Sequence, residues 1–309
     1  MNFANQRTRA SLAIIAGSSL WGMFWIPLRW LDTNGVTGLW AVALICACAC
    51  LVALPAIRIW GSGPLKMSRS TLVVGLGIGL SMVLYFAAMI FSDVIRVIFL
   101  FYLLPVWATI TARVLYGERV RPIQLLSIGL ALAGLWLLLG GEGGLPVPKN
   151  LGDIFGLASG FFWGLSLTLI RGNPDLDPFA NAAAPFVVGT PIAIAIGSLL
   201  YFLGVDGASA LPSNQAIGTV IFVAIAFGIL VLWPSMLAQV WGARFVSAPT
   251  AALLTMSEII FATLSAGLII GTNLGTLALF GGALVILAAL VDLASSPKDE
   301  TAAQATGET

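Results

Sequence analysis

Glu258 is the side chain with the most unusual chemistry in this sequence, because it lies near the middle of an apolar stretch from residue 247 to 270. On insertion scales a carboxylate at the centre of a bilayer costs about 2.5 to 3.5 kcal/mol, so it avoids lipid. Three roles fit: a contact for a substrate ammonium group, a carrier of a coupling proton, and a structural carboxylate held by serine, threonine or backbone.

Trp163 and Trp21 form a second group of candidates. Trp163 shares one helix face with Ser166, and with Ser159 and Ile170, at spacings of three and four residues. A tryptophan in mid-span, with serine on either side, predicts the wall of a cavity, since a lipid-facing indole prefers the headgroup level. The alternative for both tryptophans is packing between helices.

Tyr85, Tyr102 and Trp107 supply further flat rings with a polar group, and two of them bracket Pro105. Aromatic rings stack on flat or cationic ligands at about 0.5 to 2 kcal/mol each. We therefore expect these three residues, with Trp163, Trp21, Ser166 and Glu258, to contact a small-molecule substrate, and Pro105 to act as a hinge. The competing interpretation is an interfacial belt of aromatic residues.

The composition excludes several classes of protein. Hydrophobic residues make up 59% of the 309 residues, charged residues only 9%, and the mean hydropathy is +1.03. A soluble domain has roughly 25% charged residues, so the chain is expected to be an integral membrane protein in contact with the bilayer. The net charge of +1 gives no field for nucleic acid, and there is no histidine.

Cysteines give no sign of a metal or redox centre. Cys46, Cys48 and Cys50 crowd one apolar segment, where small residues let helices approach. Metal ligation needs convergent ligands, and no histidine assists. No metal, no cofactor and no catalytic residue is expected, and an enzyme is the less favoured reading because the apolar segments offer mainly isolated hydroxyls.

Ten segments have about the 20 apolar residues that cross a bilayer. The sequence therefore predicts an all-α membrane protein with ten transmembrane helices and no separate soluble domain. The expected limits are 11–29, 36–57, 71–91, 93–115, 122–140, 153–171, 180–203, 215–240, 247–270 and 273–293.

The two halves of the chain repeat one another. Ala108-Thr109 and Gly117 match Ala262-Thr263 and Gly271 at an offset of 154 residues, and the segment 16–22 matches 158–164 at an offset of 142. We divide the chain into a first five-helix repeat at 1–140, a periplasmic connector at 141–152, a second repeat at 153–293 and a disordered cytoplasmic tail at 294–309.

The positions of lysine and arginine predict the orientation. Cytoplasmic loops retain basic residues, and eleven of the fourteen fall on the side that holds both termini. Both termini are expected to be cytoplasmic. Because each repeat has five spans, the repeats must be inverted, and inverted repeats enclose a central substrate site in many secondary transporters. The eleven are Arg7, Arg9, Arg58, Lys66, Arg69, Arg113, Arg119, Arg121, Arg171, Arg244 and Lys298.

Two motifs resemble a known family. Gly-Ser-Ser-Leu-Trp-Gly at 17–22 and Pro-Val-Trp-Ala with Leu-Tyr-Gly-Glu between Pro105 and Glu118 are similar to the EamA-type exporters of the drug/metabolite transporter superfamily. Within that group the chain resembles the bacterial exporters of aromatic amino acids and methyl viologen. It departs from the family pattern at Ile259, where a proline commonly follows the glutamate, and at Thr272, where Gly-Glu is usual.

The resemblance implies a function. We expect a multi-pass secondary transporter of a bacterial-type inner membrane that exports aromatic or other apolar amino acids by alternating access, without ATP hydrolysis. Export of other metabolites or flat organic cations by the same fold is the first alternative, and a non-transporting scaffold or sensor is the second. A monomer is the expected form.

Overall fold

The structure, a computed structural model, describes residues 3–61, 67–140, 147–205, 217–271 and 275–295, and all regular structure in these ranges is helical. Much of the expected connector at 141–152 and nearly all of the expected tail at 294–309 lie outside the described residues.

The helices fall into two sets, one in each repeat. The first set is α1 (Phe3–Trp21), α2 (Trp25–Thr33), α3 (Gly38–Trp60), α4 (Arg69–Phe91), α5 (Val94–Phe101), α6 (Leu104–Tyr116) and α7 (Pro122–Leu138). The second set is α8 (Leu151–Gly172), α9 (Pro178–Phe202), α10 (Ile217–Phe227), the π-helix η1 (Gly228–Leu232), α11 (Trp233–Ala243), α12 (Ala248–Thr255), α13 (Ser257–Ile270) and α14 (Thr276–Ser295).

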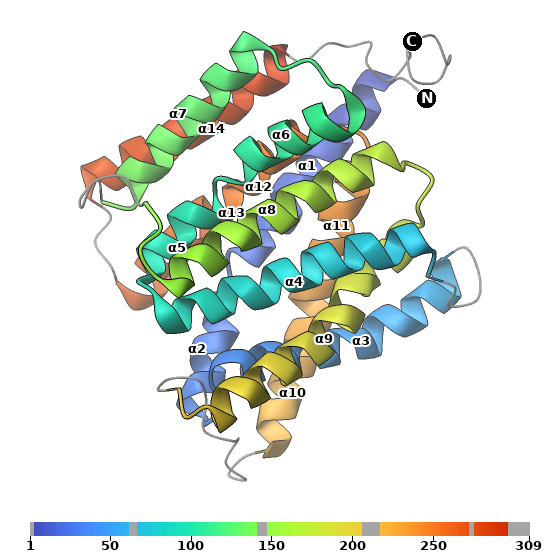
Figure 1. Cartoon of the computed structure of the whole chain (residues 1–309), viewed down its shortest axis with the longest axis vertical. Coiled ribbons are helices and arrows are strands. Elements are labelled where there is room, and N and C mark those ends of the chain that lie inside the picture. The colour runs from blue at the N-terminus through green and yellow to red at the C-terminus, as the bar shows by residue number, and fades with distance from the viewer. Residues whose placement is uncertain (1–2, 62–66, 141–146, 206–216, 272–274, 296–309) are drawn as a thin grey trace.

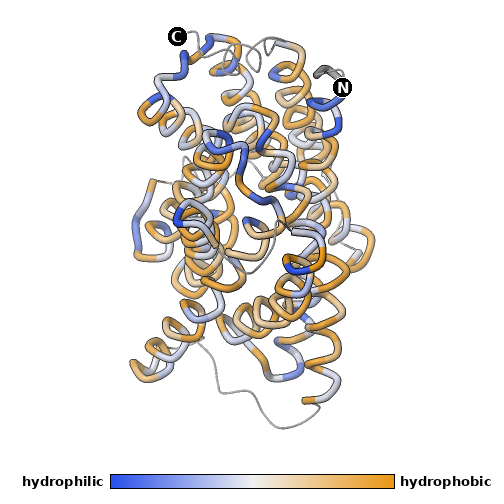
Figure 2. Tube along the Cα trace, turned by 90° about the vertical axis from the view of Figure 1, so that its right-hand side faces the viewer, coloured by the Kyte–Doolittle hydropathy of each residue, from blue (hydrophilic) through white to orange (hydrophobic). Residues whose placement is uncertain are grey.

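These elements confirm the predicted membrane-spanning fold. In the described part of the chain nine helical spans are long and apolar enough to cross a bilayer, and α7, with 17 residues, is a shorter apolar tenth. Figure 2 shows apolar residues along most of the helices. The first helix begins at Phe3, before the expected residue 11, because a helix can continue past the bilayer through polar residues.

Several of the predicted spans are broken near their middle. The first divides between Trp21 and Trp25, the fourth at Tyr102 and Leu103, and the ninth at Met256. The breaks in the fourth and ninth spans are 154 residues apart, which is the offset of the sequence repeat. The eighth span stays continuous but passes through η1.

Equivalent contacts between helices in the two repeats are related by the same two sequence offsets, 154 and 142. Ser81 donates a hydrogen bond to the Ser159 carbonyl at 2.8 Å, and its counterpart Ser235 donates to the Gly17 carbonyl at 2.7 Å. Gly117 and Gly271, which also match, both end their helices with φ near +70°, at 68° and 74°. The repeat therefore extends from the sequence to individual hydrogen bonds.

Each repeat packs its first helix against the other repeat. The helix α8 lies along α4, α5 and α6, while α1 lies along α11, α12 and α13. The pair α7 and α14 packs together at one side of the bundle (Figure 1). The start of α1 and the end of α14 share one end of the bundle, where Arg7 donates to the Leu293 carbonyl. We call this the terminal end, and its opposite the distal end.

A row of glycines lets α8 lie against the broken fourth span. Gly156 faces Val97 of α5, Gly160 faces the Phe101 carbonyl at the end of α5, and Gly164 faces the first turn of α6. A Cβ on Gly160 would overlap the Phe101 oxygen. Small residues at such positions let membrane helices approach closely, so this row holds both halves of the broken span.

We expect Gly160→Ala to destabilise the fold by about 1 to 3 kcal/mol, because the added methyl group overpacks the contact with α5. Thermal unfolding in detergent measures the loss. Gly129→Ala is the matched control, since nothing lies within 4 Å of a Cβ there and its helix propensity improves. Equal melting temperatures for Gly160→Ala and the wild type would contradict this account of the break.

Candidate functional site

The break in the fourth span places polar backbone in the middle of the membrane. Pro105 lies in the first turn of α6 and has no N–H, and a proline ring clashes with the carbonyl four residues before it. That carbonyl belongs to Phe101, the last residue of α5. The predicted hinge residue is therefore next to a real break, which lies on the N-terminal side of the proline.

The ninth span breaks without a proline. Ile259, at the position that matches Pro105, donates its N–H to the Met256 carbonyl at 3.2 Å. Met256 lies between α12 and α13, and Glu258 lies in the first turn of α13. Gly22, at the end of α1, faces the Glu258 carbonyl and the Ala262 amide, as Gly164 faces the matching groups of Leu104 and Ala108.

Eight aromatic rings meet between these breaks. Phe101 is the centre, with its ring centroid 5.0 Å from Tyr102, 4.9 Å from Tyr85 and 6.3 Å from Trp163. Trp163 lies 6.2 Å from Trp21, which continues the contacts into the other repeat. We call this group the aromatic cluster. Its members are Trp21, Phe24, Tyr85, Phe86, Phe101, Tyr102, Trp163 and Phe227.

The aromatic cluster contains four of the predicted site residues, Trp21, Tyr85, Tyr102 and Trp163. Its four phenylalanines were not predicted from the sequence. Phenylalanine carries no polar group that would distinguish these positions among the 17 in the chain. The sequence could have indicated two of them by their neighbours, since Phe86 and Phe101 are each adjacent in the chain to a predicted tyrosine.

Glu258 adjoins the aromatic cluster. The Tyr102 hydroxyl lies close to the Glu258 carboxyl group and interacts with it, and Tyr85 is also near enough for an electrostatic interaction with this carboxyl group. The hydroxyls of Thr255 and Ser257 bond instead to the carbonyls of Ala251 and Ile15. The neighbours of the carboxyl group are thus tyrosines from the other repeat, and not the serine or threonine that a structural role for Glu258 would have used.

Accessible surface remains at this site although it lies in mid-span. Glu258 and Tyr85 are half-buried, whereas Tyr102 is 1% exposed and Trp163 5% exposed. The Trp163 indole N–H is buried and has no hydrogen-bond partner among the described residues. An unpaired buried donor costs about 1 to 3 kcal/mol, so it is available to a ligand acceptor.

Two predicted contact residues lie elsewhere. Ser166 is fully buried, donates to the Phe162 carbonyl and faces Gly77 of α4. Trp107 pairs with Phe161 at 5.5 Å and makes no ring contact with the aromatic cluster. Trp107 belongs to α6, beyond the break, whereas Tyr102 lies at the break itself, so the two rings face different directions. In the described residues no three metal-binding side chains gather.

The site is closed asymmetrically. Toward the terminal end α6 packs against α12, whereas toward the distal end no comparable packing joins α5 and α13 among the described residues. Arg171 donates to the Arg244 carbonyl at 3.0 Å, and Arg244 donates to the Pro174 carbonyl, which ties the terminal ends of α8 and α11. Arg96 and Asp153 form an ion pair that fixes the distal end of α5 to α8.

Comparison with known proteins agrees with this architecture. A solved structure described as "Crystal structure of protein" superposes with a TM-score of 0.73 at 20% sequence identity, covering 92% of this chain and 96% of its own. At that identity the likeness shows the fold alone. No curated protein matches significantly.

A family model matches the chain twice, at residues 8–140 and 150–293. The two matches cover most of the sequence and coincide with the two five-helix repeats. Its description is the EamA-like transporter family. With ten apolar helices in two related halves, this chain is a multi-pass membrane protein that belongs to the EamA-like transporter family.

Proposed function

We propose that this protein is a secondary transporter that exports aromatic or other apolar amino acids across a bacterial-type inner membrane. The observation that carries the proposal is the meeting of the aromatic cluster with Glu258 at two broken helices. Discontinuous helices near the midplane of inverted repeats form the substrate site in many secondary transporters. Both termini are proposed to be cytoplasmic, so the terminal end faces the cytoplasm.

Each part of an aromatic amino acid has a matching group. The side-chain ring stacks on Trp163, Trp21 or Tyr85. The ammonium group pairs with Glu258 in place of the Tyr102 hydroxyl. The carboxylate accepts from the Trp163 N–H, and the N-terminus of α13 favours its negative charge. The site is therefore complementary to a zwitterion with a flat side chain.

Flat organic cations are the second candidate substrates. Glu258 balances a positive charge, and tryptophan and tyrosine faces attract cations by about 0.5 to 2 kcal/mol. Such a compound needs no acceptor for a carboxylate, so it leaves the Trp163 N–H unused. A scaffold or sensor would bind these ligands without moving them.

In this proposal, transport proceeds when the site alternates between closure by α6 and α12 at the terminal end and closure by α5 and α13 at the distal end. Substrate reaches the site when α5 and α13 are apart and leaves when α6 and α12 separate. The position in the first repeat that matches Glu258 is Leu104, so no second carboxyl group is present there for a proton relay. We therefore favour facilitated diffusion, and uphill accumulation driven by a pH gradient in liposomes would contradict that preference.

Trp163→Ala should raise the tryptophan concentration that gives half-maximal flux in liposomes by about tenfold. This change corresponds to about 1.4 kcal/mol of lost stacking and hydrogen bonding. Trp60→Ala is the matched control, because Trp60 is 66% exposed and lies outside the aromatic cluster. If Trp163→Ala lowers the melting temperature but the folded fraction transports normally, Trp163 is a packing residue.

Glu258→Gln tests the ammonium contact through three ligands of the same ring. Loss of a charge-assisted hydrogen bond, worth about 1.5 to 3 kcal/mol, should weaken binding of tryptophan and tryptamine by roughly 10- to 100-fold. Binding of indole-3-propionate, which lacks the ammonium group, should not weaken. Calorimetry on purified protein gives the three affinities. An equal loss for all three ligands would remove Glu258 from the ammonium site.

A further inference from the structure

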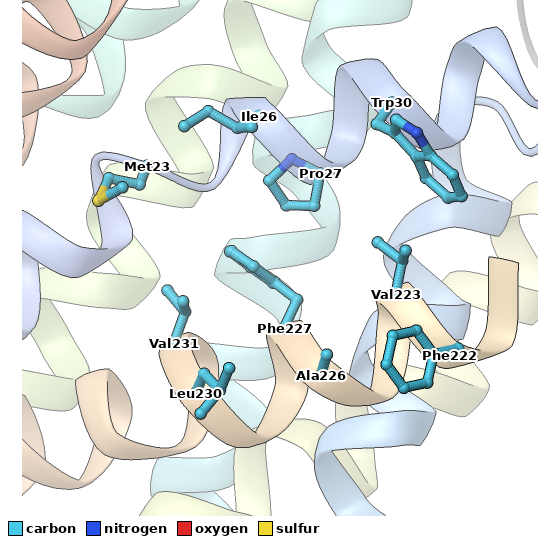
Figure 3. A pocket seen from close by; sticks show the side chains of 10 residues that line it. All are labelled: Met23, Ile26, Pro27, Trp30, Phe222, Val223, Ala226, Phe227, Leu230 and Val231. Carbon is cyan, nitrogen blue, oxygen red and sulfur yellow. The ribbon is translucent and has the colours of Figure 1, made fainter. Parts of the chain in front are cut away.

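An apolar groove lies beside the aromatic cluster, between α2 and the α10–η1 segment, and shares Phe227 with it. Its volume is about 420 Å³. Figure 3 shows side chains from the two segments facing one another across it, with Met23 opposite Val231 at one end and Trp30 near Val223 at the other. The lining consists of Met23, Ile26, Pro27, Trp30, Phe222, Val223, Ala226, Phe227, Leu230 and Val231.

The chemistry of this lining suits a hydrocarbon chain. The indole N–H of Trp30 is the single polar side-chain group among the ten residues. Phe222 is 71% exposed and Leu230 69% exposed, and both belong to a membrane-spanning segment. A concave apolar surface that opens toward lipid offers acyl chains more contact than a flat helix face does.

A cation directly precedes the distal lining residue Trp30 in the sequence, although it is not itself one of the lining residues. Arg29 is exposed, one residue before Trp30, where α2 approaches its end at Thr33. It forms no hydrogen bond or ion pair with any described part of the chain, and Asp32 on the same helix does not pair with it. Arginine binds phosphate in a planar two-pronged geometry, and tryptophan favours the headgroup level of a bilayer.

The groove is shaped by two irregular segments. The break between α1 and α2 sets the direction of α2, and η1 displaces Leu230 and Val231 from a regular α-helical course. Its inner wall, Phe227, also contacts Phe24 at 5.6 Å in the aromatic cluster. Isolated π-helical turns occur frequently at functional sites.

We propose that a phospholipid occupies this groove, with one acyl chain between α2 and α10–η1 and its phosphate on Arg29. The apolar lining selects the chain, and the exposed guanidinium of Arg29, next to Trp30 in the sequence, selects the phosphate. A second copy of the protein would leave Arg29 without a phosphate and is the competing occupant. The proposal does not depend on the transported substrate.

Nanodiscs of phosphatidylcholine that contain phosphatidylglycerol with a diazirine on its acyl chain test this site. Irradiation should give adducts concentrated on residues 23–30 and 222–231. Ala226→Trp fills the groove and should abolish these adducts, whereas Ala283→Trp, at an exposed alanine of α14, should leave them unchanged. Melting temperatures of the two variants confirm that both remain folded.

Arg29→Ala separates headgroup binding from general lipid contact. It should raise the lipid concentration needed for half-maximal labelling by about tenfold, while Arg58→Ala, an exposed arginine of α3, should have no effect. Labelling spread evenly over lipid-facing helices such as α14 would show annular lipid only and overturn the proposal. The proposal would also be overturned if the groove residues carried no label and the particles had the mass of two chains, because a second copy of the protein would then occupy the groove.

Discussion

The close contact between α8 and the broken fourth span is the constraint on which the other features depend. In hydrocarbon every backbone carbonyl needs a partner, so a broken helix persists only where protein covers the break. Gly160 covers the freed Phe101 carbonyl, and Gly164 lets the next helix begin beside it. The contact that Gly164 makes recurs where Gly22 meets α13. Without these glycines, the two halves of each span could not change direction at the membrane centre.

From this constraint follows the position of the site. The breaks bring Tyr102 from one repeat next to Glu258 from the other, and Trp163 and Trp21 come with the two helices that cover the breaks. The two inverted repeats make similar backbone contacts, but their side chains at the site differ in chemistry. Glu258 matches Leu104, and Met256 matches Tyr102. A single carboxyl group thus acts within a nearly symmetric frame, which suits an asymmetric zwitterion.

Much of the fold could be predicted because the sequence repeats itself. The offsets of 154 and 142 correctly relate Ser81 to Ser235 and Gly164 to Gly22. These pairs can be found in the sequence because small residues at a fixed spacing mark the contacts between membrane helices. The pairing of Tyr102 with Glu258 could not be predicted, because it joins distant segments through breaks that shift the helix faces.

The faces of Ser166 and Trp107 depend on which neighbouring helix covers them. Spacing alone places Ser166 on the same side as Trp163, but α4 packs against that side and buries it. Trp107 follows the break, which changes the direction of the helix after Tyr102. The phenylalanines of the aromatic cluster carry no polar signal, so the contact geometry of the folded chain is needed to find them.

Distances between spin labels test the exchange of closures most directly. One label pair joins α5 and α13 at Ile95 and Ile269, and the other joins α6 to the segment before α12 at Val114 and Phe245, in a chain whose three cysteines are replaced by alanine. On addition of tryptophan the first distance should shorten and the second should lengthen. If both stay unchanged during transport, or both move in the same direction, the account is contradicted.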